Sequence, residues 1–226
     1  MVLKLYYNIN ASPCRAVLYT LNALNVPYEI VDISLLHHEQ KTEKFRKMNP
    51  QHTIPTIEDE DGFILWDSHA INAYLAAKYG KDEHDKLYPK DLKARAIVDQ
   101  TLHFNNSVLF ASLLNNIKTI IVRESITKIT PVLKESVEEA FDFLEKFLAD
   151  GRRFVAGNDI TIADFSITTT ITNLTVFMPL VLKGYPLVSE YYKRNEAFIP
   201  GFQEIEAEVK ISVGEILSSL NYEFDE

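Results

Sequence analysis

The 226-residue sequence contains one cysteine, Cys14, and none of the paired cysteine and histidine spacings typical of zinc sites. A single cysteine excludes an internal disulfide, and no metal is expected. The sequence also lacks an apolar run of membrane-spanning length, and its first residues have no apolar signal-peptide core. We therefore expect a cytoplasmic protein without a membrane partner, in a reducing compartment.

Positive charge is in deficit, because 23 lysines and arginines stand against 32 aspartates and glutamates, for a formal net charge of −9. Repulsion from phosphates argues against general affinity for nucleic acid or anionic membranes. Hydrophobic residues make up 46% of the chain, which is ordinary for a globular protein. The length allows one large domain or two small ones.

The first third of the chain alternates between strand-like and helix-like segments. Residues 1–7 and 27–33 alternate as strands do, and residues 13–24 between them have a helical period that begins with Pro13. This order predicts two parallel strands joined by a helical crossover. Downstream, we expect a helix over 41–48, a hairpin of 56–58 with 63–66, and a helix over 68–79. Asp67 or Ser68 caps this last helix and Gly80 stops it.

The remainder of the chain reads as helix throughout. Residues 80–90 have the polar, proline-containing composition of a linker. Apolar residues then recur at three-to-four spacing over 92–116, 126–148, 162–182, 187–194 and 205–217. Thr161 and Asp164 form a capping box at one helix start. The prediction is an α/β domain over 1–79, a linker over 80–90 and an all-helical domain over 91–226.

Five short motifs in this order resemble those of a known enzyme family: they are "SPCRAV", "NPQHTIPTI", "DSHAI", "KYGKD…LYPKD" and "FVAGNDITIADFSI". The chain is similar to the cytosolic glutathione S-transferases over its whole length, and most similar to the insect delta and epsilon classes. "PQHTIP", "SHAI" and "HF…VLFA" favour epsilon. The resemblance implies a thioredoxin-like N-terminal domain that binds glutathione as co-substrate. It also implies an all-helical C-terminal domain that forms a pocket for small hydrophobic electrophiles, and a homodimer.

The resemblance also assigns a glutathione site. Its Ile-Pro peptide is expected to be cis, so that the main chain of Ile54 pairs with the cysteinyl part of glutathione. Ser68 and the helix N-terminus suit the γ-glutamyl carboxylate, and Asp67 suits the amine. His52 and Gln40 would meet the glycyl carboxylate, although Gln40 carries no charge. The implied set is Gln40, His52, Thr53, Ile54, Pro55, Asp67, Ser68 and His69.

The residue that would activate the thiol is less clear, because the chain departs from the family here. In delta and epsilon relatives a serine lies three residues before the cysteine position of "PCR", where this chain has Ala11. Three interpretations stay open. Ser12 reaches the thiol from the next position, or the helix N-terminus alone stabilises the thiolate, or glutathione binds without fast conjugation. We assign Ser12 as catalytic, Cys14 as a buried hydrophobe and Arg15 as a surface or interdomain ion-pair partner.

The electrophile pocket is expected where the long helix faces the cleft. Each candidate could instead belong to the helical core, since the spacing alone does not distinguish the two. The candidates are Ala11, Leu36, Asn105, Leu109, Ser112, Leu113, Asn116 and Phe177. The implied function is conjugation of glutathione in xenobiotic detoxification, including insecticide resistance. The alternatives are a glutathione-dependent isomerase or peroxidase, and a non-catalytic carrier of hydrophobic ligands.

Overall fold

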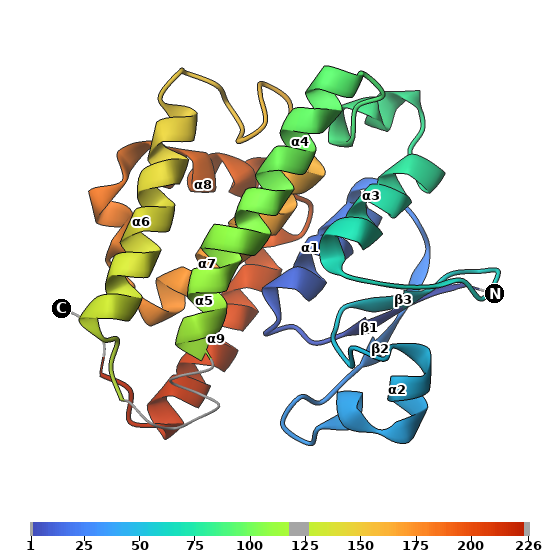
Figure 1. Cartoon of the computed structure of the whole chain (residues 1–226), viewed down its shortest axis with the longest axis horizontal. Helices are drawn as coiled ribbons and strands as arrows, with labels where there is room; N and C mark the ends of the chain where they lie inside the picture. Colours follow the sequence, from blue (N-terminus) through green and yellow to red (C-terminus); the bar gives the residue numbers. More distant parts are fainter. Residues whose placement is uncertain (1, 118–126, 224–226) are drawn as a thin grey trace.

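The computed structural model describes residues 2–117 and 127–223. Its N-terminal part contains a four-stranded sheet in the order β2-β1-β3-β4 (Figure 1). The strands are β1 Leu3–Tyr7, β2 Tyr28–Asp32, β3 Thr56–Glu58 and β4 Ile64–Trp66. β1 and β2 are parallel, whereas β3 is antiparallel to both β1 and β4. The predicted crossover unit and hairpin are confirmed.

Three helices cover this sheet. They are α1 Ser12–Ala23, α2 Glu43–Met48 and α3 Ser68–Tyr79. α1 and α3 pack against each other above the sheet, and α2 lies below it (Figure 1). The alternation of β1 explains both layers, because Leu5 is buried in the core while Tyr6 places its ring edge-on against Phe45 of α2. Gly80 is the C-cap of α3, as predicted.

The rest of the described chain forms the helical domain, shown in green to red in Figure 1. Its helices are α4 Leu92–Phe104, α5 Phe110–Ile117, α6 Pro131–Leu148, α7 Ile162–Phe177, α8 Pro186–Phe198 and α9 Phe202–Ser219. A π-helical segment over Asn105–Leu109 joins α4 to α5, so the predicted helix over 92–116 is nearly continuous.

Several predicted helices have different bounds in the structure. The helices predicted over 41–48, 187–194 and 205–217 correspond to α2 Glu43–Met48, α8 Pro186–Phe198 and α9 Phe202–Ser219. Two others differ at one end by more. The helix predicted over 162–182 ends at Phe177, and a separate 3₁₀ turn over Val181–Gly184 follows it. The helix predicted over 126–148 begins at Pro131, whose missing N–H is tolerated in a first turn. Its predicted first residue, Ile126, lies outside the described residues.

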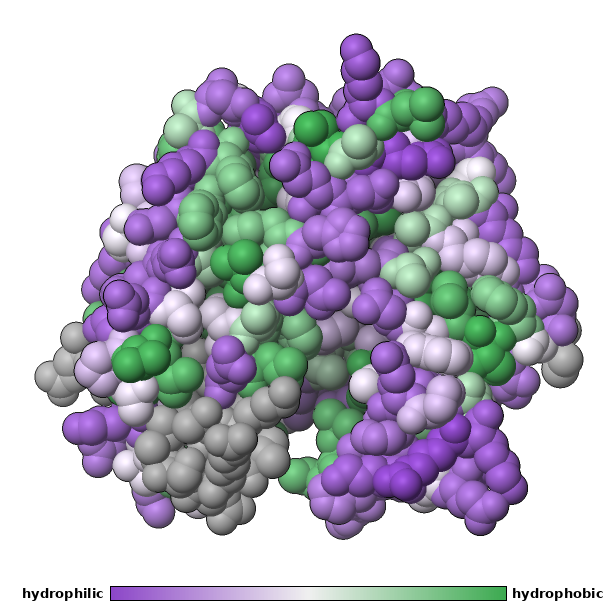
Figure 2. Space-filling model, in the orientation of Figure 1, coloured by the Kyte–Doolittle hydropathy of each residue, from purple (hydrophilic) through white to green (hydrophobic). Residues whose placement is uncertain are grey.

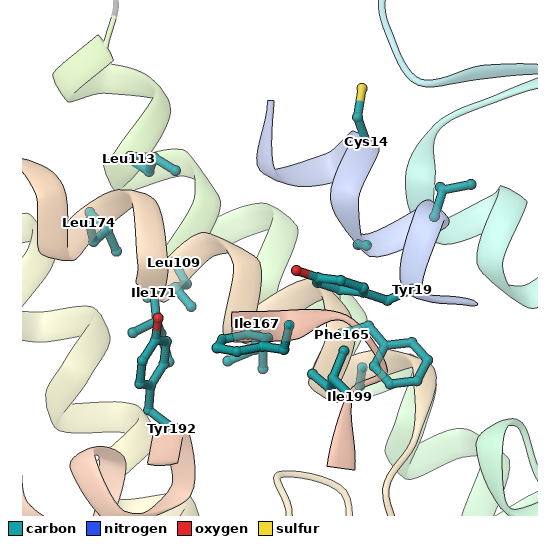
Figure 3. Close-up of a cluster of buried hydrophobic side chains, with 14 of the residues drawn as sticks. Cys14, Tyr19, Leu109, Leu113, Phe165, Ile167, Ile171, Leu174, Tyr192 and Ile199 are labelled. Carbon is teal, nitrogen blue, oxygen red and sulfur yellow. The ribbon is translucent and has the colours of Figure 1, made fainter. Parts of the chain in front are cut away.

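Helix α7 forms the centre of the core. Residues Ile162–Asn173 are all buried, and α1, α4 and α9 pack around the helix. Figure 3 shows Ile167 and Ile171 of α7 beside Tyr19 of α1 and Leu109 of the π-helical segment. The capping box at its start is confirmed, since the Thr161 N–H donates to Asp164 Oδ2 at 2.7 Å. α7 is therefore the fixed element against which both domains are positioned.

The surface is mixed in character. On the face shown in Figure 2, hydrophilic residues dominate and hydrophobic ones form separate patches. Among the described residues, every helix is too short or too polar to cross a bilayer.

Candidate functional site

Four segments of the chain leave the sheet at the same end. β1 ends at Tyr7, which pairs with Asp32 at the end of the parallel strand β2. Tyr6 pairs with Thr56, the first residue of β3, and Thr56 pairs with Trp66, the last residue of β4. The loop before α1, the segment after β2, the loop before β3 and the start of α3 therefore gather at one edge. The loop before β3 and the start of α3 carry all the residues that the family resemblance assigns to glutathione except Gln40, which lies in the segment between β2 and α2.

The loop before β3 is organised by Asn49, a residue that the sequence analysis missed. Asn49 is fully buried, and its Nδ2 donates to the Thr53 carbonyl at 3.0 Å and to Thr56 Oγ1 at 3.0 Å. Its Oδ1 accepts from the Gln51 N–H, and its carbonyl accepts from the His52 N–H. One amide thus fixes both sides of the loop. The sequence signal was an asparagine directly before a proline in a turn-like stretch.

The main chain at Ile54 has unused hydrogen-bonding groups. The Ile54–Pro55 peptide bond is cis, as predicted, with Pro55 buried and Thr53 exposed. Within residues 2–117 and 127–223, neither the N–H nor the C=O of Ile54 has a hydrogen-bond partner. His52 stands beside it, partly exposed, with a φ of 45°. These free groups can pair with an extended peptide in the manner of an added strand.

The start of α3 combines an anion with free donors. Asp67 is the N-cap, and its Oδ1 accepts from the N–H groups of His69 at 3.0 Å and Ala70 at 3.2 Å. Its carboxylate is exposed, and Ser68 has a free N–H and hydroxyl as far as the described chain extends. Of the two caps that the sequence allowed, Asp67 or Ser68, the structure has Asp67. A zwitterionic group would find a carboxylate and two donors here.

His69 faces away from this corner, towards the helical domain. Its Nε2 lies 3.2 Å from Nδ2 of Asn105, the first residue of the π-helical segment. Burial lowers the pKa of His69, Asp67 opposes this shift and His103 adds to it. A hollow of about 320 Å³ beside it is lined by α3 and α4 residues including Asp67, His69, Asp99 and His103.

The segment after β2 carries two further predicted residues, Gln40 and Leu36. Gln40 is half-buried, and its Oε1 is enclosed without a hydrogen-bond partner in the described part of the chain. Leu36 is 78% exposed at the same sheet end. Leu36 therefore presents apolar surface to solvent, and the contact of Gln40 with a glycyl carboxylate stays a prediction.

The start of α1 differs from the sequence prediction in one respect. Ala11 is the N-cap, where it offers no side-chain hydrogen bond. Ser12 is only 1% exposed, and its Oγ is buried without a partner among the residues described. The hydroxyl is therefore enclosed and not directed to an open site. The Ser12 N–H, in contrast, donates to no carbonyl of the described residues and is available to a ligand. Cys14 is fully buried, and burial raises its pKa to about 12.

Most of the predicted electrophile pocket lies in the core. Leu109 and Leu113 are fully buried, Leu109 lies beside Ile171 of α7 in Figure 3, and Phe177 is 1% exposed. Asn105 and Ser112 are also buried; Ser112 Oγ donates to the Leu109 carbonyl. These five residues are helix core, the alternative that their spacing left open. Ala11 is half-buried, Leu36 is exposed, and the Asn116 side chain lies outside the described residues.

Comparison with known proteins decides the family. Residues 11–78 match the N-terminal domain and residues 109–194 the C-terminal domain of glutathione S-transferase. Glutathione S-transferase 1 of Manduca sexta is 41% identical over 196 residues, which are 86% of this chain and 88% of that protein. The chain belongs to the glutathione S-transferase family.

Solved structures of insect glutathione transferases agree in fold and sequence. An epsilon-class enzyme from the housefly, Musca domestica, superposes with a TM-score of 0.89 at 41% identity, covering 97% of this chain and 99% of that one. A homologue from a Drosophila species, solved with bound glutathione, superposes with a TM-score of 0.89 at 38% identity, covering 99% of each chain. This chain is accordingly an insect-type transferase of the delta/epsilon group, whose general role is detoxification. The substitution of Ala11 for the catalytic serine stays a prediction.

Proposed function

We propose that this glutathione transferase binds glutathione at the common sheet end and joins its thiolate to hydrophobic electrophiles in xenobiotic detoxification. The observation that supports this most strongly is the gathering of free polar groups there. The main chain of Ile54 and the donors of Ser68 have no partner in the described chain, and the Asp67 carboxylate is exposed, with Oδ1 capping α3 and Oδ2 without a partner among the described residues.

The chemistry of glutathione matches these groups one by one. Its cysteinyl main chain needs a donor and an acceptor, and the free N–H and C=O of Ile54 provide them as the edge of a sheet would. Its γ-glutamyl end carries a carboxylate and an amine, which suit Ser68 and Asp67 respectively. Its glycyl carboxylate would lie towards His52 and Gln40, with Thr53 and Pro55 shaping the loop and His69 supporting α3 from behind.

The thiolate is proposed to lie at the N-terminus of α1. A free thiol has a pKa of about 8.5, so a donor or a helix dipole must favour the thiolate anion at neutral pH. The Ser12 side chain is enclosed, and so the proposal uses the Ser12 N–H and the helix N-terminus. The electrophile would approach over Ala11 and the exposed Leu36.

We also propose a cytoplasmic homodimer that pairs through α3 and α4. The hollow between these helices carries His69, His103 and Asp99 and is open at the surface of a single chain. Sedimentation equilibrium at micromolar concentration tests this assignment, and a monomer there rejects it.

The direct test is retention on immobilised glutathione together with turnover of 1-chloro-2,4-dinitrobenzene. Ser68→Ala removes one proposed contact, and we expect its KM for glutathione to rise about tenfold, equivalent to about 1.4 kcal/mol. Ser218→Ala is the matched control, because Ser218 is exposed on α9 and makes none of the contacts described at the sheet end. Equal KM values for the two variants would reject the assignment of Ser68.

A second candidate function is a glutathione-dependent isomerase or peroxidase with weak aryl transfer. The observation that favours it is the missing hydroxyl at Ala11 together with the enclosed Ser12 side chain. Turnover of organic hydroperoxides or ketone isomers that exceeds aryl transfer supports this candidate. Binding of a hydrophobic dye without any glutathione turnover instead identifies a carrier.

A further inference from the structure

The loop before α1 is held by the helical domain. The Asn10 carbonyl accepts from Asn173 Nδ2 of α7 at 2.9 Å. The Asn10 side chain donates from Nδ2 to Ser212 Oγ of α9 at 3.1 Å. Within its own domain, the loop is tied by Asn8, whose Nδ2 donates to the Ile33 carbonyl and whose Oδ1 accepts from the Asn10 N–H. Two helices distant in sequence therefore help to set where α1 begins.

Arg15 connects the same loop to a buried carboxylate. Its side chain is fully buried, and Nε donates to Glu206 Oε1 of α9 at 2.9 Å. One terminal nitrogen donates to the Ile9 carbonyl at 2.6 Å. The other donates to the Thr169 carbonyl and to Asn173 Oδ1, the latter at 2.6 Å. Tyr19 adds a hydrogen bond to the same Glu206 oxygen. The guanidinium is thus paired, and the described residues accept four of its five N–H donors, as suits a buried cation.

Asn173 is the point at which these two sets of contacts meet. Its Oδ1 accepts from Arg15, and its Nδ2 donates to the loop at Asn10. The residue is 2% exposed, so neither contact competes with bulk water. Its amide orientation is fixed by chemistry, because Arg15 can only donate and the Asn10 carbonyl can only accept.

We infer that Asn173 is a positioning residue that acts from the helical domain to fix the loop before α1, and with it the N–H groups proposed to stabilise the glutathione thiolate. This inference rests on the proposed function, in which those groups replace a side-chain hydroxyl. A helix N-terminus stabilises an anion only over its first turn, so a small displacement of the loop changes the effect directly. The Ser212 contact to Asn10 supports the same loop from α9.

The test measures the pH dependence of kcat/KM for aryl transfer and the ultraviolet absorbance of the bound thiolate. Asn173→Leu removes both contacts, and Asn173→Asp keeps an acceptor for Arg15 but loses the donor to Asn10. We expect both variants to raise the thiol pKa of bound glutathione by about half a unit, as loss of part of a helix-terminus interaction implies.

Thr170→Val is the matched control. Thr170 is buried on the same helix, and its hydroxyl donates within α7 to the Ser166 carbonyl and does not touch the loop. It should lower the melting temperature without moving the pH profile. If Asn173→Asp and Asn173→Leu also leave the pH profile unchanged, the positioning role is rejected and Asn173 is a structural residue only.

Ser212→Ala keeps the inference testable if the Asn173 variants do not fold. Ser212 is half-exposed, and its loss should move the pH profile in the same direction by a smaller amount. An unchanged profile in that variant counts against the inference. Failure of the proposed function is distinguishable, because the unmodified protein would then show no glutathione-dependent turnover.

Discussion

The hydroxyl of Tyr79, in the last turn of α3, donates to Asp59 Oδ1 at 2.5 Å. Asp59 lies just after β3, and its other oxygen accepts from Tyr74 and Lys78. The carboxylate therefore fastens the β3–β4 hairpin to the outer face of α3. Because Asp67 and Ser68 begin the same helix, this contact also supports the corner proposed to bind glutathione.

Asp59→Asn should destabilise the protein in a pH-dependent way. Burial alone would raise the pKa of Asp59, but hydrogen bonds from Lys78, Tyr74 and Tyr79 outweigh it and hold the pKa well below its usual range. Stability from a depressed pKa is fully present above the unfolded value of about 3.9 and is lost as the pH falls through the folded pKa. We expect the variant to lose about 2 kcal/mol at pH 7. The difference from the unmodified protein should shrink below about pH 4.

Urea unfolding at several pH values measures this difference. Asp32→Asn is a suitable control, since Asp32 is exposed on β2. A loss of stability that stayed constant down to the acid transition would show that the Asp59 charge is not the cause.

Asn49→Ala should weaken glutathione binding indirectly, because Asn49 holds the loop before β3 and is itself fully buried. The change leaves the Thr53 carbonyl and Thr56 hydroxyl with fewer donors in a buried loop, at a cost of about 1–3 kcal/mol. We expect a several-fold rise in KM for glutathione with a smaller change in kcat, measured by initial rates. Gln51→Ala is the control, because Gln51 is exposed in the same loop, and its KM for glutathione should match that of the unmodified enzyme. Equal KM values in both variants would argue that the loop does not depend on Asn49.

Ser12→Ala separates the interpretations that the sequence left open. The Ser12 hydroxyl is buried and unpartnered in the described chain, so we expect its removal to change stability by less than about 1 kcal/mol and to leave the pKa of the bound thiol unchanged. A pH–rate profile of aryl transfer provides the measurement. A rise in the thiol pKa would instead restore Ser12 as the catalytic donor.

Ala11→Ser should increase aryl transfer. Ala11 is the N-cap of α1 with φ −86° and ψ 105°, a conformation that serine commonly adopts at this position. A hydroxyl there adds a donor at the helix start, and we expect the thiol pKa to fall by about half a unit, equivalent to about threefold more thiolate below that pKa. The kcat/KM for aryl transfer at about pH 6.5 should rise accordingly. Ala23→Ser, at the other end of α1, is the control.

Local pattern accounts for most of the fold. The capping box of Thr161 and Asp164, the stop at Gly80 and the crossover around α1 could be predicted because each depends on neighbours within a few residues. The bounds of α7 could not be predicted, since apolar residues continue beyond Phe177 after the helix itself has ended. Residues such as Leu109 and Leu113 could not be assigned either, because helical spacing marks an apolar face without naming what that face meets.

The sequence by itself determined the order of the elements and the segments that hold Ile54, Asp67 and Ser68, because short-range periodicity, caps and turns encode them. Tertiary structure decided that these segments meet at one sheet end, through strand pairing between residues such as Tyr6 and Thr56. It also decided that Arg15 is buried beside Glu206 and Asn173, and that the Ser12 hydroxyl is enclosed. The start of α1 depends on residues of α7 and α9 that lie far away in the chain, and such contacts leave no local signal.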